Sequence, residues 1–362
     1  MELCDNEYSN KSHLKLTSWP RISSLNSVAI LDLSNNSLTS IPDDICQLHH
    51  LAVLKLNANN LESVPESLCH TPNLQALHIA SNNVHELPLT IGYLTKLRIL
   101  DVSLNPLREL PQSIGECREL THIITSKTRI SSFPSSLRNA TKIVLVDVSK
   151  SPVTHIDTII FPEWKRLSYI NISFIKTCPL MEFIGNFSHL RHLDISYMGI
   201  GHLPLFLCKL TNVDYFDIGG NELSVIPNEF AALDSIDYLD ISSNMLENIP
   251  QFIGDFPRLD TLVAADNRIS SWPKIANKFT TLRILDMSRN QLTRIPSSIN
   301  SLRHLELLNI KYNDVRSIPW SIIQEHPTLE TLYVGGNPLH VPKRYEKLDM
   351  LDDDISDSDM DV

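Results

Sequence analysis

Three aspartates at a regular spacing of 23 residues are the feature of this sequence best suited to binding chemistry: Asp194, Asp217 and Asp240. A His or Tyr ring stands two positions before each of them. Carboxylates attract guanidinium and ammonium groups, and flat rings add contact area and cation–π attraction. We therefore predict a surface for a protein partner with a basic face, formed by Tyr169, His192, Asp194, Tyr197, Tyr215, Asp217, Tyr238 and Asp240.

A repeating pattern must position these side chains. The stretch from Leu51 to Leu61 reads L-x-x-L-x-L-x-x-N-x-L, and fourteen such repeats start between Val28 and Leu329. Their spacing is 23 residues, except for two steps of 24. Successive side chains of a strand point to opposite faces, so Leu54 and Leu56 should point into the core and Lys55, between them, should lie on the surface.

Residues at the same place in successive repeats should form columns, because stacked repeats align their strands in parallel. Asp194, Asp217 and Asp240 then lie on adjacent strands, where like charges repel unless a cation intervenes. Aspartate is also ordinary at this position of such repeats, and the row could be no more than that. The column expected to be exposed is Asp32, Lys55, His78, Asp101, Ile124, Asp147, Asn171, Asp194, Asp217, Asp240, Val263, Asp286, Asn309 and Tyr333.

An asparagine at the strand exit recurs in ten of the fourteen repeats. Its amide both donates and accepts, so it can satisfy buried backbone groups of its own turn and of the neighbouring one. The predicted structural ladder is Asn36, Asn59, Asn82, Asn105, Asn221, Asn244, Asn267, Asn290, Asn313 and Asn337. The four exceptions are consecutive, Thr128, Ser151, Ile175 and Met198, and they predict one irregular block.

A proline step completes most repeats, as in Ile41-Pro42 and Trp272-Pro273. Proline stops the strand, and the segment after it is too short for more than a turn or two of helix. The combined pattern, as in residues 41–51, resembles the leucine-rich repeat family over residues 14–345. It is similar to the intracellular 23-residue class, with scaffolds of the Shoc2/Sur-8, plant intracellular Ras-group and Scribble/Erbin kinds.

This resemblance implies the fold, an α/β solenoid: a leucine-rich repeat horseshoe with a concave parallel β-sheet and short helical or irregular convex segments. It also implies small GTPase or phosphatase partners. We divide the chain into residues 1–27, an N-terminal segment with a degenerate capping repeat, residues 28–345, one solenoid, and residues 346–362, an acidic tail. Residues 1–13 are polar and expected to be loose. The tail has seven Asp between residues 349 and 361 and is expected to be disordered.

Composition and motifs narrow the function class. The net charge is −11, with 11 acidic and 3 basic residues in 190–260, which disfavours nucleic acid as a partner. Six scattered cysteines, without the clusters of secreted repeat proteins, favour a reducing cytoplasm. No signal peptide, membrane span, catalytic motif, metal motif or cofactor motif is visible.

The sequence therefore predicts a monomeric, cytoplasmic, non-catalytic scaffold or adaptor in signal transduction. Two alternatives stay open at this point. One is a regulatory or substrate-recognition subunit of a phosphatase or ubiquitin ligase, and the other is a structural anchoring protein. No F-box, RING or kinase segment is visible in the chain, so a subunit of this kind would have to be recruited to its enzyme.

Overall fold

The computed structural model describes residues 8–156, 159–175, 181–274, 276–339 and 351–352 of the chain. The chain divides into two compact units, Met1–Leu190 and Arg191–Val362, called unit 1 and unit 2 below. Four cysteines fall within the described residues, Cys46, Cys69, Cys117 and Cys208, and all four are free thiols.

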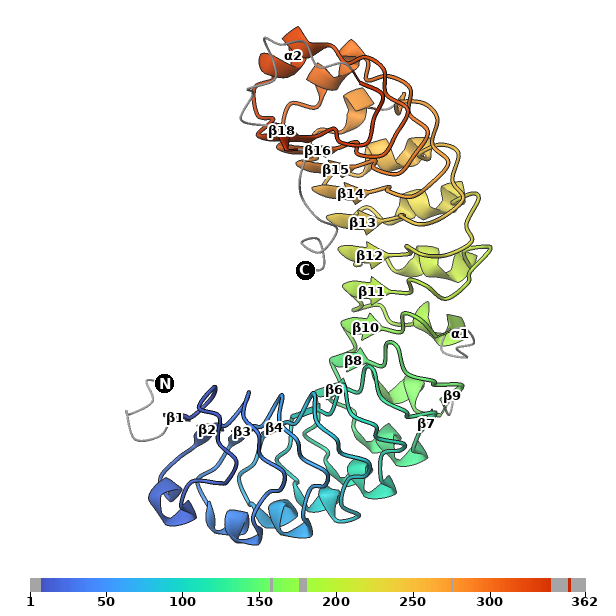
Figure 1. The fold of residues 1–362 in the computed structure, drawn as a ribbon. Helices are drawn as coiled ribbons and strands as arrows, with labels where there is room; N and C mark the ends of the chain where they lie inside the picture. The colour runs from blue at the N-terminus through green and yellow to red at the C-terminus, as the bar shows by residue number, and fades with distance from the viewer. Residues whose placement is uncertain (1–7, 157–158, 176–180, 275, 340–350, 353–362) are drawn as a thin grey trace. The chain divides into compact units, whose positions relative to one another are not determined.

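Short parallel strands lie side by side in chain order in each unit and form its strand face, with short helical turns on the opposite side (Figure 1). The strands of unit 1 are β1 (Tyr8–Asn10), β2 (Ile30–Asp32), β3 (Val53–Lys55), β4 (Ala76–His78), β5 (Ile99–Asp101), β6 (His122–Ile124), β8 (Leu145–Asp147) and β10 (Tyr169–Asn171). Those of unit 2 are β11 (His192–Asp194), β12 (Tyr215–Asp217), β13 (Tyr238–Asp240), β14 (Thr261–Val263), β15 (Ile284–Asp286), β16 (Leu307–Asn309), β17 (Thr331–Tyr333) and β18 (Leu351–Asp352).

The turns opposite the strands are mostly single 3₁₀ segments that start after the proline step. Pro42, with φ of −72°, directly precedes η2 (Asp43–Gln47). In unit 1 the others are η1 (Ile22–Leu25), η3 (Glu66–His70), η4 (Ile91–Tyr93), η5 (Gln112–Glu116), η6 (Ser135–Asn139), η7 (Phe161–Glu163) and α1 (Met181–Ile184). In unit 2 they are η8 (Leu205–Lys209), η9 (Asn228–Ala232), η10 (Gln251–Asp255), η11 (Ala276–Lys278), η12 (Ser297–Ser301) and α2 (Trp320–Gln324).

The core lies between the strands and the turns, as the leucine pattern predicts. Leu54, Leu56 and Leu61 are completely buried, while Lys55 is half-buried on the strand face. Neighbouring strands pair so that equivalent residues of successive repeats lie opposite each other, as Asp32 lies opposite Lys55. The predicted fold class is confirmed: each unit is a leucine-rich repeat solenoid built on an open parallel sheet.

The ladder asparagines hold the strand exits. The Nδ2 group of Asn59 donates to the carbonyls of Leu33 at 2.9 Å and Leu56 at 3.0 Å. Its Oδ1 accepts from the backbone N–H of Leu38 at 3.0 Å. One amide therefore satisfies backbone groups of its own repeat and of the preceding repeat. The other nine asparagines bond in the same way.

Hydroxyl groups take over part of this role where the asparagines stop. Ser151 Oγ donates to the Thr125 carbonyl at 2.9 Å and accepts from the Thr128 N–H at 3.0 Å. Ile175 and Met198 are buried apolar side chains instead. Within this block, β7 (Ser132–Phe133) pairs with β9 (His155–Ile156), and Pro134 follows β7 while no proline follows β9.

The two ends of the chain carry strands that the sequence pattern did not predict. Tyr8–Asn10, expected to be loose, pair with Ile30–Asp32. The register is stabilised by the Lys11 N–H, which donates to the Asp32 carbonyl at 2.7 Å. At the other end Leu351 and Asp352 pair with β17. The rest of the predicted tail, 346–350 and 353–362, lies outside the described residues, so its predicted disorder stays a prediction.

Replacing Asn59 by alanine should lower the free energy of unfolding by about 3 kcal/mol, because buried backbone groups of two repeats lose their partners. Replacing Thr128 by valine should cost only about 1 kcal/mol. The Thr125 carbonyl that its hydroxyl bonds keeps a second donor in Ser151 Oγ, and the other contacts of the hydroxyl, to Ser151 Oγ at 3.2 Å and the Ile130 N–H at 3.4 Å, are long. Urea unfolding followed by circular dichroism measures both. Equal losses for the two variants would contradict this account of the ladder.

Candidate functional site

Three stacked rings form a row across the first strands of unit 2. Strand register places His192 opposite Tyr215 and Tyr215 opposite Tyr238. The His192 and Tyr215 ring centroids are 3.9 Å apart with planes inclined by 12°. Those of Tyr215 and Tyr238 are 4.4 Å apart with planes inclined by 3°. This ring row follows directly from the 23-residue period, because β strands of one register carry equivalent residues side by side.

The three aspartates form a second row beside the rings, here called the acidic row. Asp194 opposes Asp217, and Asp217 opposes Asp240. A Cβ atom built on Gly219 would lie 3.1 Å from the Oδ1 atoms of both Asp217 and Asp240, so glycine leaves the space that these carboxylates occupy. The structure thus brings together seven of the eight residues predicted for the partner surface, if Tyr197 at the strand exit is counted.

Each aspartate of the row also has a local structural task. Its Oδ1 accepts from the backbone N–H two residues further on, at 2.9 Å for Asp194, 2.8 Å for Asp217 and 2.7 Å for Asp240. This bond closes the turn at the strand exit. Asparagine does the same elsewhere in the column, since Asn171 accepts from the Ser173 N–H at 3.0 Å. The turn therefore requires the side-chain oxygen and not the negative charge.

Burial and crowding shift the protonation of both rows. Burial, followed by the neighbouring carboxylates of Asp240 and Asp194, raises the pKa of Asp217 to about 8. The pKa of Asp240 is raised as well, mainly by burial. Burial lowers the pKa of His192 to about 4 and raises that of Tyr215. The rings are therefore neutral at pH 7, and the acidic row holds a proton.

Two aspartates of the same column in unit 1 have a basic neighbour. Lys55 Nζ lies 3.9 Å from Asp32 Oδ2, and His78 Nδ1 lies 3.9 Å from Asp101 Oδ2. Within the described part of unit 2, neither Asp217 nor Asp240 forms an ion pair with a basic side chain. An added cation would therefore gain more at the acidic row than at the corresponding residues of unit 1.

A further set of aspartates lies where the chain enters the strands. Arg191 contacts Asp214 at 3.3 Å, and Arg283 contacts Asp260 at 3.7 Å. Asp237, between them, has a raised pKa because of partial burial and the nearby Asp214. This neighbouring column adds negative potential beside the ring row, although arginines compensate its two ends.

Tyr197 and Tyr169 are placed differently from the ring row. Tyr197 is exposed at the strand exit, with φ of 54°, and its ring packs against Gly220. Tyr169 lies in unit 1, on β10, opposite Leu145 of β8. It therefore belongs to a different unit from the other seven residues. Its part in one common surface stays a prediction.

The expectation that the whole column is exposed is wrong at β15 and β16. Asp286 is 2% exposed and Asn309 5% exposed. Asn309 Nδ2 donates to Asp286 Oδ2 at 3.0 Å, while the Ser288 N–H donates to Oδ1 at 2.7 Å. These two side chains satisfy each other, and alternation along the strand could not reveal that. Asp286 therefore does not extend the acidic row, which ends with Asp240 on β13.

Sequence reasoning also missed a backbone feature that shapes the strand exits. The residue before each ladder position has a positive φ in all fourteen repeats, for example 55° at Asn35 and 61° at Gly220. A glycine at this position, as in Gly220, was the signal that could have revealed it. This conformation turns the chain out of the strand.

Metal and membrane chemistry find no support among the described residues. That part of the chain has no group of three or more His, Cys, Asp or Glu side chains arranged to hold a metal ion. Its helices are all too short to cross a lipid bilayer.

These features define a repeat solenoid with a surface on its strand face, and comparison with known proteins identifies the family. The family model described as leucine-rich repeat matches residues 26–84, 188–246 and 280–339. The chain contains leucine-rich repeats, a fold typical of protein–protein interaction modules. A search of curated proteins found no match.

Solved structures with the same fold come from several sources. A leucine-rich repeat protein of Leptospira interrogans is 24% identical, with a TM-score of 0.80, covering 97% of this chain and 96% of its own. The ectodomain of the plant receptor kinase GASSHO1/SCHENGEN3 from Arabidopsis thaliana, solved with Casparian strip integrity factor 2, is 28% identical with a TM-score of 0.65. That match covers 91% of this chain and 44% of the ectodomain. InlJ from Listeria monocytogenes is 19% identical, with a TM-score of 0.67, over 88% of this chain and 70% of its own.

Replacing Gly220 by alanine should destabilise unit 2 by about 2 kcal/mol, because the methyl group meets the Tyr197 ring and the positive φ strains alanine. Removing the ring with Tyr197→Ala in the same chain should recover about half of this loss. Chemical unfolding of the two single variants and the double variant measures the coupling. Additive losses would show that the ring does not pack on Gly220.

Proposed function

We propose that this protein is a non-catalytic scaffold or adaptor in intracellular signalling, and that it binds an arginine-bearing segment of a protein partner on the strand face of unit 2. The observation that carries the proposal is the juxtaposition of the ring row with the acidic row. Asp217 and Asp240 stand one strand apart without a basic partner among the described residues, beside rings stacked at 3.9 and 4.4 Å.

Arginine suits this surface better than lysine. Its guanidinium is flat and can lie over the exposed edge of an aromatic row while its N–H groups donate to a carboxylate. In the acidic row Oδ1 is used by the turn, so Oδ2 is the atom of Asp217 and Asp240 that would accept from the ligand. The neutral His192 adds a flat contact without repelling a cation.

The form of the ligand is suggested by related folds. The receptor kinase ectodomain was solved in complex with Casparian strip integrity factor 2, and another structural neighbour is a plant peptide hormone receptor in complex with RGF2. We infer that an extended segment of the partner lies across the strands here too. Small GTPases and phosphatases remain the partner classes that the repeat resemblance implies.

An intracellular setting fits the cysteine chemistry. Cys69 and Cys117 are buried free thiols, and burial raises the pKa of both, to about 12 for Cys117. Such thiols are unreactive fillers, and neither forms a disulfide with another described cysteine. The proposal places the protein in the reducing cytoplasm, as a monomer, without a cofactor.

Removing the charge of the acidic row should weaken partner binding strongly without unfolding the turns. The variant Asp194→Asn/Asp217→Asn/Asp240→Asn keeps each side-chain oxygen for its backbone N–H, as Asn171 does naturally. We expect its affinity for a synthetic arginine-rich peptide to fall by about 100-fold, corresponding to about 3 kcal/mol. Isothermal titration calorimetry measures the peptide, and affinity purification from the native cell measures the partner set.

A matched control lies in unit 1 at the same column position. Asp147 accepts from the Ser149 N–H at 2.9 Å, so Asp147→Asn removes one charge from an equivalent turn. This control should bind like wild type. If the triple variant also binds like wild type, while its circular dichroism spectrum is unchanged, the acidic row is only a structural feature of the turns.

Binding of the arginine-rich peptide should strengthen as pH rises towards 8. The raised pKa keeps Asp217 largely protonated at pH 7, and a bound guanidinium stabilises its ionised form, so binding releases a proton. Affinity should therefore rise by up to about tenfold per pH unit between pH 6 and 8 and level off above. Calorimetry in two buffers of different ionisation enthalpy measures the released proton. Binding heats that are the same in both buffers would contradict the linkage.

A further inference from the structure

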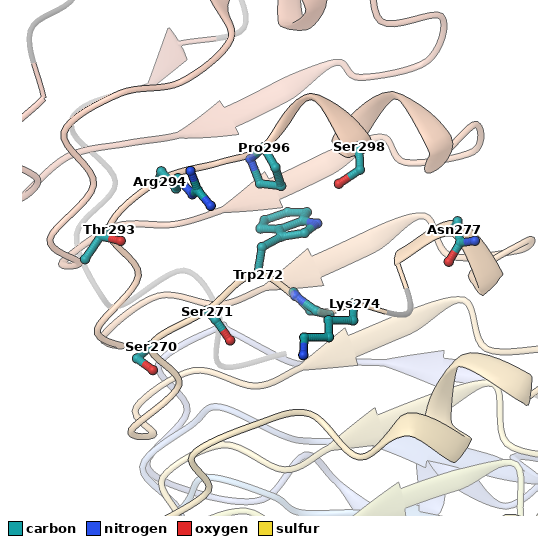
Figure 2. Close-up of a pocket in the computed structure, with 10 residues that line it drawn as sticks. Ser270, Ser271, Trp272, Lys274, Asn277, Thr293, Arg294, Pro296 and Ser298 are labelled. Carbon is teal, nitrogen blue, oxygen red and sulfur yellow. The ribbon is translucent and has the colours of Figure 1, made fainter.

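A pocket of about 640 Å³ opens on the flank of unit 2, away from the acidic row. It lies between two successive repeats, where the chain runs from the strand exit to the proline step (Figure 2). One repeat contributes Trp272, Lys274 and Asn277, and the next contributes Arg294 and Ser298. All of these residues belong to unit 2, so the pocket does not depend on unit 1.

Most residues of the pocket lining carry a side-chain hydrogen-bond donor. Lys274 and Arg294 are exposed cations, and neither forms an ion pair with another described residue. The Asn277 amide and four hydroxyl side chains, including that of Ser298, add neutral donors, and no Asp or Glu belongs to the lining. Two cations among neutral donors favour an anion, and a dianion more than a monoanion.

The indole of Trp272 gives the independent sign of a missing ligand. Trp272 is 9% exposed, and its Nε1 is buried without an acceptor among the described residues. In Figure 2 the ring lies at the centre of the pocket, with its nitrogen on the side of Ser298 and Asn277. A buried donor without an acceptor is costly.

Other tryptophans of the chain show what satisfied indoles look like. Trp164 Nε1 donates to the Leu137 carbonyl at 3.3 Å, and Trp19 Nε1 donates to the Ser40 carbonyl at 2.6 Å. The carbonyl of an adjacent repeat supplies the acceptor in both cases. Trp19 precedes Pro20 just as Trp272 precedes Pro273, yet the Trp272 indole has no such acceptor among the described residues. An oxygen that enters its pocket would supply the acceptor instead.

We propose that this pocket binds the phosphate of a phosphorylated serine or threonine in a segment of a protein partner. The phosphate oxygens accept from Arg294, Lys274 and the indole N–H. A peptide suits the space, because the pocket is larger than one phosphate and continues into a second hollow of about 380 Å³ that shares Trp272 and Lys274 and reaches Asn248. This site is separate from the acidic row and selects the opposite charge.

The test titrates the full chain with a degenerate peptide library that carries one central phosphoserine, with the unphosphorylated library as comparison, while fluorescence anisotropy reports binding. Phosphorylation should strengthen binding by at least about tenfold. Arg294→Gln should remove most of this gain, and Trp272→Phe, which keeps the ring but removes the N–H, should weaken binding by about threefold or more. Arg303→Gln, which removes one exposed cation outside the pocket, should bind like wild type.

Several outcomes overturn the proposal. Equal binding of the two libraries shows that no phosphate is recognised, and equal losses for Arg294→Gln and Arg303→Gln show only general charge attraction. Binding to phosphatidylcholine vesicles that contain a phosphatidylinositol phosphate, with no binding of the phosphoserine library, reassigns the pocket to a membrane lipid. Circular dichroism of each variant excludes loss of fold as the reason for lost binding.

Discussion

The bonds of the ladder asparagines constrain everything else in this protein. Each repeat must turn its chain out of a three-residue strand, which leaves backbone groups buried between turns. An amide such as that of Asn59 satisfies carbonyls of two repeats and an N–H of the preceding one. That reach across repeats fixes the register of successive strands. Residues at equivalent positions of successive repeats consequently become neighbours in each sheet.

This register makes rows of like side chains unavoidable, and the two units treat them differently. In unit 1 Lys55 and His78 stand between Asp32 and Asp101, so that opposite charges such as Lys55 and Asp32 lie 3.9 Å apart. In unit 2 carboxylates follow one another, and burial with mutual repulsion raises the pKa of Asp217 and Asp240. The fold needs only the side-chain oxygens at these positions. The second carboxyl oxygens of Asp217 and Asp240 are therefore available for recognition, and the stacked rings of Tyr215 and Tyr238 lie beside them as a flat contact surface.

Periodicity was sufficient to predict the strands, the buried leucines and the alignment of His192 with Tyr215, because these depend only on position within the repeat. It failed where neighbouring side chains decide the outcome. The burial of Asp286 depends on Asn309, and the position of the Tyr197 ring depends on Gly220. The strand at Tyr8–Asn10 was missed because its polar residues lack the leucine pattern, although the open edge of β2 accepts their backbone. The unsatisfied indole of Trp272 could not be read from sequence at all, because the acceptor that it lacks belongs to three-dimensional packing.

The central claim is that the acidic row of unit 2 is a receptor for an arginine side chain. The most direct measurement is a carbon-detected NMR titration of the Asp217 carboxyl group, with and without an arginine-rich peptide. The account predicts that Asp217 titrates well above the ordinary range of an aspartate in the free protein, and that its pKa falls when the peptide binds. An ordinary pKa near 4 that the peptide leaves unchanged would contradict it.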